Sequence, residues 1–251
     1  MARFFLPREN LQAKRGVIDG QELEHLRRVL RLGPGAPIIV FDDLGGEHEA
    51  VVRSVTADRA EIEILRSVQS VRESSLELTL ALGLTKGEKM DLVVEKATEL
   101  GVRTIAPFIS AYSVPRFDAA KSARRAERWR KIALNAAKQC GRTQVPAISP
   151  LCDFSTLLSR PEPALKLLCW EREGQYSLQH AYENHSTAQA LLLAIGPEGG
   201  FNAEEAERAR SHGFECVHLG RRILRAETAA LAAATLAQYL WGDLGEGSSP
   251  P

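Results

Sequence analysis

The sequence predicts an α/β protein of two parts: a small β-rich N-terminal domain and a larger C-terminal domain built on a mainly parallel sheet. Short β-type runs joined by glycine-containing turns occupy the first 70 residues or so. Beyond them, apolar runs alternate with amphipathic helical segments, the pattern of βα units. The 251 residues suffice for a small and a medium domain. We therefore expect domains at residues 1–72 and 73–251.

The N-terminal domain is expected to be a small β-barrel-like unit. Strands are predicted at residues 37–41, 50–55 and 60–64, and the last of these alternates cleanly between apolar and polar residues. A helix over residues 21–32 precedes them, and Gly33-Pro34-Gly35 ends it.

The C-terminal domain is predicted to open with a buried strand at residues 76–84. Thr85-Lys86-Gly87-Glu88 then fits a capping box at the start of a helix, and Asn202 with Glu205 fits another. The remaining expected elements are strands at 104–109, 165–170, 190–195 and 215–219, and helices near 121–140, 203–212 and 226–241.

Composition excludes several classes of protein. Hydrophobic residues make up 44% and charged residues 25% of the chain, as in globular proteins. No apolar run is long enough to span a membrane, and the N-terminus lacks a secretion signal, so we expect a cytoplasmic protein with no membrane partner. Four dispersed cysteines suggest neither a zinc site nor disulfides. The net charge is zero, but residues 121–142 form a locally basic segment that suits RNA phosphates, or else a solvated helix face.

Two glycine-containing loops follow predicted strands: Ile195-Gly196-Pro197-Glu198-Gly199-Gly200-Phe201, and the segment from Leu219 to Ala229. Ligands of open α/β sheets bind where the carboxyl ends of strands meet such loops. Glycines allow a flat base to approach the backbone. Neither loop matches a phosphate-binding motif, which favours an adenine-type nucleoside ligand without phosphates. A plain strand-to-helix turn is the competing interpretation of the first loop alone.

Arg225 lies at the predicted start of the last helix. A guanidinium keeps its proton, so its uses are binding a phosphate or stabilising an anion. The alternative is an ion pair with Glu227. When Arg225 is considered by itself, this ion pair is the favoured interpretation.

The sequence resembles the RsmE-type ribosomal RNA uridine-N3 methyltransferases of the SPOUT superfamily. The most specific matches are GPEGGF and LGRRILRAETA. The others are Arg3-Phe4-Phe5, His25-Leu26-Arg27-Arg28-Val29-Leu30-Arg31, Lys86-Gly87-Glu88-Lys89-Met90-Asp91, Lys96-Ala97-Thr98-Glu99-Leu100-Gly101-Val102, Arg128-Trp129 and Gln139-Cys140-Gly141-Arg142.

This resemblance implies a PUA-like RNA-binding β-barrel followed by a SPOUT α/β trefoil-knot domain. It also implies a homodimer, S-adenosylmethionine as cofactor, no metal, and small-subunit ribosomal RNA or the assembled small ribosomal subunit as partner. Topology rules alone would have predicted an unknotted, doubly wound sheet.

The expected site residues follow from the loops and the resemblance together. Arg225 is the predicted catalytic residue, supporting the uridine anion. The residues expected to bind S-adenosylmethionine are Ile195, Gly196, Glu198, Gly199, Gly200, Leu219, Gly220, Ile223, Leu224, Glu227, Thr228 and Ala229. The residues expected to bind RNA are Arg3, Phe5, Lys86, Arg116 and Arg142.

One departure from the family and two competing functions remain open. The family commonly has an arginine where this chain has Tyr112, and Arg116 is the residue that would compensate. The chain could instead be a non-catalytic PUA-type RNA-binding protein or a small-molecule enzyme, and a SPOUT methyltransferase could have another RNA target. The sequence names no general base, and it does not say which uridine is modified or whether the substrate is free RNA or an assembled subunit.

Overall fold

The structure is a computed structural model that describes residues 1–42, 45–69, 72–112, 119–161 and 165–245. The chain divides into two compact units. The first contains residues 1–73 and 134–145, and the second contains residues 74–133 and the chain from 146 onward. The sequence pattern gave no reason to place residues 134–145 with the first unit. The domain limits 1–72 and 73–251 stay a prediction.

The first unit is built on a six-stranded sheet in the order β1-β4-β5-β6-β3-β2. Strands β1 and β4 are parallel, and the other pairs are antiparallel. The predicted strands are present, two of them longer than expected, whereas β1, β2 and β3 are too short to show a periodic pattern. The strands are β1 (Ala2–Phe5), β2 (Leu11–Gln12), β3 (Arg15–Ile18), β4 (Pro37–Phe41), β5 (Glu47–Val55) and β6 (Ala60–Val68).

The predicted helix over residues 21–32 is wrong in length and type. A short 3-10 helix, η1 (Arg8–Asn10), comes first; α1 (Gly20–Glu24) then continues as a π-helix, η2 (His25–Val29). Leu23 and Leu26 anchor this segment in the core of the unit. Hydrophobic spacing could not reveal the π-turn. A π-turn only lengthens each backbone hydrogen-bonded loop of the helix by one residue, which changes the spacing of apolar side chains too little to be recognised.

The second unit is built on a parallel seven-stranded sheet, as predicted. Its main path runs β10-β8-β7-β12-β11-β13, and β9 pairs with β8. The two shortest strands, β9 and β10, were not predicted. The strands are β7 (Glu77–Gly83), β8 (Thr104–Ile109), β9 (Ala147–Ile148), β10 (Cys152–Asp153), β11 (Leu165–Cys169), β12 (Ala190–Ile195) and β13 (Phe214–Val217).

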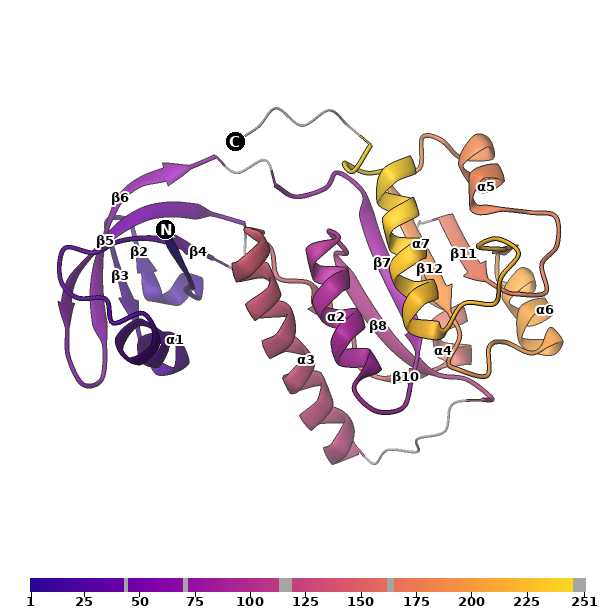
Figure 1. Cartoon of the computed structure of the whole chain (residues 1–251), viewed down its shortest axis with the longest axis horizontal. Coiled ribbons are helices and arrows are strands. Elements are labelled where there is room, and N and C mark those ends of the chain that lie inside the picture. Colours follow the sequence, from indigo (N-terminus) through magenta and orange to yellow (C-terminus); the bar gives the residue numbers. More distant parts are fainter. Residues whose placement is uncertain (43–44, 70–71, 113–118, 162–164, 246–251) are drawn as a thin grey trace. The chain divides into compact units, whose positions relative to one another are not determined.

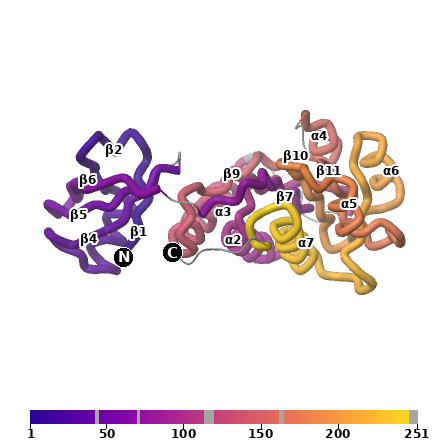
Figure 2. Tube along the Cα trace, turned by 90° about the horizontal axis from the view of Figure 1, so that it is seen from above, coloured from indigo at the N-terminus to yellow at the C-terminus, as the bar shows by residue number. Residues whose placement is uncertain are grey.

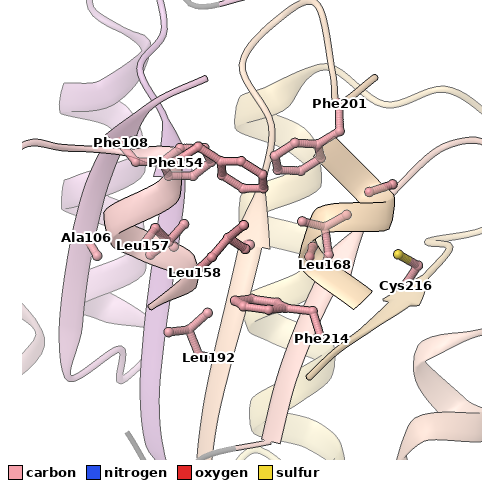
Figure 3. Close-up of a cluster of buried hydrophobic side chains, with 14 residues drawn as sticks. Ala106, Phe108, Phe154, Leu157, Leu158, Leu168, Leu192, Phe201, Phe214 and Cys216 are labelled. Carbon is pink, nitrogen blue, oxygen red and sulfur yellow. The ribbon is translucent and has the colours of Figure 1, made fainter. Parts of the chain in front are cut away.

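Helices cover both faces of this sheet (Figure 1). Helices α4 and α6 pack against one face of the sheet, where alternate residues of the strands point into an aromatic-rich core. This core includes Phe108, Leu168 and Leu192 (Figure 3). Helix α7 contacts β7 and β12, and it lies beside α2 in both views (Figures 1 and 2). The helices are α2 (Lys89–Glu99), α3 (Ala119–Cys140), α4 (Phe154–Leu158), α5 (Leu178–Asn184), α6 (Ala203–Ser211) and α7 (Ala226–Leu240).

The two predicted capping boxes had different outcomes. The box formed by Asn202 and Glu205 is present at the start of α6. The box predicted at Thr85 is wrong, because α2 begins at Lys89 after Glu88, which makes no side-chain capping hydrogen bond. Residues 85–88 instead form a loop, and the Lys86 amide donates to Glu198. Among the described helices, none has the length and apolar character needed to cross a membrane.

Candidate functional site

A cavity of about 480 Å³ lies at the carboxyl ends of β11, β12 and β13, within the second unit. Its volume falls in the range typical of small-molecule sites. It is lined by Lys89, Cys169, Trp170, Glu171, Ile195, Gly196, Pro197, Glu198, Gly199, Gly200, Leu219, Gly220, Arg221, Arg222, Ile223, Leu224, Arg225, Ala226 and Ala229.

Strand β11 lies between the two strands that carry the predicted loops, because it pairs with β12 on one side and β13 on the other. The residues at its end, Cys169, Trp170 and Glu171, therefore line the cavity as a third wall. Sequence reasoning missed them. Strand adjacency is a non-local property, and the segment after β11 carries no glycine motif at this point.

The first loop, residues 196–201, is closely folded on itself. A Cβ atom on Gly196 would lie 2.9 Å from the carbonyl carbon of Gly200, so a side chain there would force the backbone apart. The Gly200 amide donates to the carbonyl of Pro197 at 2.9 Å, and its φ of +67° favours glycine. A Cβ atom on Gly199 would lie 2.7 Å from Cβ of Tyr112.

Buried aromatic side chains anchor the far end of this loop. Phe201 is 2% exposed, and its ring lies 6.1 Å from Phe108 and 5.4 Å from Phe154, measured between centroids (Figure 3). The indole Nε1 of Trp170 donates to the Phe201 carbonyl at 3.0 Å. The loop is thus tied both to the core and to the end of β11, which makes a rigid wall for the cavity.

The second loop, residues 219–225, is open by comparison. Gly220 has a φ of +107°, and a Cβ atom there would meet nothing within 4 Å. The Gly220 amide donates to Nδ1 of His218 at 3.1 Å, which gives His218 a structural role. Ile223 is 84% exposed although it lines the cavity. An exposed apolar side chain at a cavity edge can gain burial when a ligand enters.

Lys89 of α2 connects the first loop to helix α7 electrostatically. Its ammonium lies 3.0 Å from Glu198 in the first loop and 3.7 Å from Glu227 in the first turn of α7. The hydrogen bond to Glu198 raises the pKa of Lys89 above its ordinary value. Burial raises the pKa of Glu198, but the hydrogen bonds from Lys89 and from backbone amides outweigh it and hold that pKa below its ordinary value. Lys89 and Glu198 are therefore both charged at neutral pH.

Arg225 is the residue immediately before α7 and lines the cavity. Its guanidinium makes no hydrogen bond or ion pair with any described residue, so the ion pair with Glu227 considered from the sequence is not formed. An unpaired cation at the edge of a cavity is available to an anionic group of a ligand.

Cys169 offers no nucleophile to the cavity. Burial, with a smaller contribution from nearby Cys216, raises the pKa of the Cys169 thiol to about 12, so the thiol stays neutral. All four cysteines are free. Within the described ranges, no group of histidine, cysteine and acidic side chains could hold a metal ion.

Most residues predicted to bind the cofactor come together around this cavity. Only Glu227 and Thr228 are absent from its lining, and Glu227 reaches it indirectly through Lys89. The lining residues that the sequence did not single out are Lys89, Cys169, Trp170, Glu171, Pro197, Arg221, Arg222 and Ala226.

The residues predicted to bind RNA are placed less uniformly. Arg142 is 4% exposed and pairs with Glu73, whereas Arg3 pairs with Glu47 and donates to the Arg142 carbonyl at 3.0 Å. Phe5 is half-buried and packs edge-on against Phe41. The Lys86 side chain is exposed beside the first loop, and Arg116 lies outside the described residues. Arg3 and Arg142 can reach a phosphate only if their ion pairs open.

The basic helix α3 is partly neutralised within the second unit. Arg128 pairs with Asp91, and Trp129, 3% exposed, donates its indole N–H to the same carboxylate at 3.0 Å. Arg130 and Lys131 lie near Glu127. These residues remain exposed apart from Trp129, so a phosphate-binding role for the helix stays a prediction.

Comparison with known proteins identifies relatives over nearly the whole chain. Residues 72–238 match the RNA methyltransferase domain family, and residues 18–65 match the RNA methyltransferase PUA domain family. The ribosomal RNA small subunit methyltransferase E of Bacillus subtilis is 33% identical over 247 residues, which is 95% of this chain and 96% of the relative.

Solved structures are similar over the same extent. The ribosomal RNA small subunit methyltransferase E of Neisseria gonorrhoeae, bound to S-adenosyl methionine, is 35% identical with a TM-score of 0.87, covering 97% of this chain and 99% of that one. A putative methyltransferase of Legionella pneumophila in complex with the same cofactor is 30% identical with a TM-score of 0.86, covering 96% and 98% of the two chains.

Proposed function

The chain belongs to the ribosomal RNA small subunit methyltransferase E family, and from this premise we propose that it transfers the methyl group of S-adenosylmethionine to N3 of a uridine in small-subunit ribosomal RNA. The observation that carries the proposal is the cavity formed by two glycine-containing loops, with the unpaired Arg225 at its edge. The competing interpretation as a non-catalytic RNA-binding protein leaves this cavity without a purpose.

The cavity suits a nucleoside cofactor without phosphates. The bare backbone at Gly220 faces open space, so a flat base can approach it closely. Glu198 in the opposite wall would repel a phosphate, whereas the sulfonium and ammonium groups of S-adenosylmethionine are cations. The apolar side chains of Ile195, Leu219 and Leu224 supply the surface that such a base buries.

S-adenosylmethionine supplies an electrophilic methyl group, so the protein has to position the uridine and favour loss of its N3 proton. Negative charge develops on the uridine ring as that proton leaves. We assign the stabilisation of this charge to Arg225, and the assignment is supported by a guanidinium that has no carboxylate partner among the described residues. Glu198 hydrogen-bonds to Lys89 and Glu227 lies 3.7 Å from the same ammonium, and neither carboxylate pairs with Arg225.

Partner, assembly and topology complete the proposal. We assign the trefoil knot to the second unit and RNA binding to Arg3, Phe5, Lys86, Arg116 and Arg142. The substrate is small-subunit ribosomal RNA, either free or in the assembled small subunit, in the cytoplasm. A homodimer is supported by the exposed apolar side chains of Leu92 in α2 and Leu236 and Tyr239 in α7, since these two helices contact each other. Sedimentation equilibrium tests the dimer, and Tyr239→Glu should weaken it.

Calorimetric titration of S-adenosylmethionine tests the cofactor assignment directly. Ala229 lines the cavity from helix α7, so Ala229→Trp should fill the cavity without entering either loop. Gln179→Trp, at an exposed position of α5, is the matched control. Binding to the wild type and the control but not to a folded Ala229→Trp supports the site. A wild type that binds RNA but no S-adenosylmethionine favours the non-catalytic interpretation. Mapping the methylated base after turnover then tests the uridine assignment.

A further inference from the structure

Five consecutive residues of the first unit, Arg27 to Arg31, have exposed side chains. They begin in the π-helix η2 and end just beyond it, before Gly33. The sequence singled out this segment as part of a family motif, yet the proposed reaction assigns it no role. We call it the arginine turn.

The backbone of the arginine turn is irregular in two ways. The Leu30 amide donates to the His25 carbonyl at 3.0 Å, five residues back, which is the hydrogen bond of a π-helix. Arg31 then has a φ of +52°, and it is the only non-glycine residue in the described ranges with a positive value. π-turns and strained residues concentrate at functional sites. Glycine would adopt this conformation of residue 31 with less strain.

The π-turn also changes which side chains are displayed. Leu23, Leu26 and Leu30 have the spacing of a single buried face of an α-helix. Leu23 and Leu26 are indeed buried, but Leu30 is 38% exposed and Val29 is 67% exposed. The turn therefore presents two aliphatic side chains to solvent between arginines, at a cost in burial that the fold alone does not explain.

The charges of the arginine turn are only partly balanced. Arg28 pairs with Glu24 at 2.8 Å, and Arg27 donates to the carbonyl of Ala57 at 2.8 Å. Arg31 has no hydrogen bond or ion pair with any described residue. The neighbouring turn at Ala57, which Arg27 contacts, carries one acidic and one basic side chain, Asp58 and Arg59, which balance each other. Of the two carboxylates of α1, Glu22 pairs with Lys138 and Glu24 pairs with Arg28. The guanidiniums of Arg27 and Arg31 therefore have no carboxylate partner among the described residues, and the turn carries unbalanced positive charge.

We propose that the arginine turn is an RNA-contact site, in which Arg31 and Arg28 bind backbone phosphates and Val29 and Leu30 pack against a ribose or a base. This assignment rests on the proposed function, which makes RNA the substrate, and it adds a surface that is separate from the methyl-transfer cavity. Guanidinium groups match phosphate geometry, and exposed apolar side chains beside them suit the unstacked bases of folded RNA. A protein partner is the alternative, and the binding measurements below separate it from RNA.

The decisive variant is Arg31→Gly, because it separates binding from stability. Glycine tolerates the backbone conformation at residue 31, so the thermal midpoint should stay the same or rise. Affinity for protein-free small-subunit ribosomal RNA, measured by filter binding, should fall roughly tenfold, and the slope of log affinity against log salt should decrease by roughly one unit. Lys14→Gly, which removes an exposed cation from the turn between β2 and β3, at the opposite end of β3 from α1, should change neither quantity.

The aliphatic contact is tested by Val29→Ser, with Leu65→Ser as the matched control because Leu65 is 57% exposed on β6. Val29→Ser should lower RNA affinity without changing the salt slope, since no charge is removed. Leu65→Ser should leave RNA affinity unchanged.

Other outcomes overturn the assignment. Wild-type affinity and slope in Arg31→Gly would show that the turn does not contact RNA. Unchanged binding to protein-free RNA, together with lost binding to assembled small subunits, would identify a protein partner instead. Titration of S-adenosylmethionine keeps the two proposals distinguishable, because cofactor binding to Arg31→Gly should equal that of the wild type, whereas failure of the wild type to bind would refute the proposed function itself.

Discussion

The first loop (196–201) and the second loop (219–225) line the same cavity, yet the structure holds them in different ways. The first loop is packed so closely that side chains at Gly196 and Gly199 would strike other atoms, and Phe201 anchors it in an aromatic core. The second loop has open space at Gly220 and exposes Ile223 and Arg225. We infer that the first loop is a preformed wall and that the second loop adjusts when a cofactor binds.

Gly196→Ala should have the largest effect, because its Cβ atom would lie 2.9 Å from the backbone of Gly200. Displacing the first loop by such a clash should lower affinity for S-adenosylmethionine roughly 100-fold in a calorimetric titration. Gly174→Ala, where a Cβ atom meets nothing within 4 Å, is the control. Gly220→Ala strains a backbone whose φ is +107°, but its Cβ atom meets nothing within 4 Å, so it should cost less than Gly196→Ala. The opposite order would break the comparison between the loops.

Arg225→Ala tests what the second loop does in catalysis. Removing a group that stabilises developing charge should lower kcat roughly 100-fold, with little change in cofactor affinity because the guanidinium serves the uridine. Transfer of radiolabelled methyl groups to small-subunit ribosomal RNA measures kcat. Arg225→Lys keeps the charge and should restore part of the activity. An equal loss of cofactor affinity would assign Arg225 to cofactor binding instead.

Lys89→Met should loosen the electrostatic connection between the first loop and helix α7. The substitution removes the cation that Glu198 and Glu227 share. Because these ion pairs are partly exposed, their loss should lower affinity for S-adenosylmethionine roughly tenfold. Lys96 on the same helix also lies between two glutamates, at 2.7 and 2.8 Å, but it does not line the cavity. Lys96→Met should therefore leave cofactor affinity unchanged, and similar losses in the two variants would remove Lys89 from the site.

The smallest expected effect is the pH dependence of the first loop. The pKa of Glu198 is depressed below its ordinary value of 4.5. The stabilisation from its hydrogen bonds is therefore fully present above about that pH, and it is lost as the pH falls through the lower, folded-state pKa. Cofactor affinity should stay level between pH 7 and the ordinary value of 4.5 and then decline. Glu198→Gln should abolish this decline in cofactor affinity at acid pH. An unchanged decline in the variant would show that another group causes it.

Sequence patterns predicted the local parts of the cavity well and its assembly poorly. Both glycine-containing loops were found because glycine clusters after apolar runs are visible in any single chain. The residues after β11 were missed because the place of β11 between β12 and β13 depends on pairing between distant segments. Lys89 was missed as a site residue for the same reason, since it lies more than 100 residues from Glu198 in the sequence.

The sequence by itself determined the α/β class, the parallel sheet, most strands and helices, and the capping box at Asn202, because hydrophobic periodicity and capping act over a few residues. The tertiary structure alone decided that Glu227 faces Lys89 and leaves Arg225 unpaired, and that Arg142 is buried against Glu73. It also decided that the helix after Gly20 widens into a π-turn and ends at a left-handed Arg31. The physical reason is that ion pairing, burial and backbone strain are settled by neighbours in space, whereas sequence patterns report only neighbours along the chain.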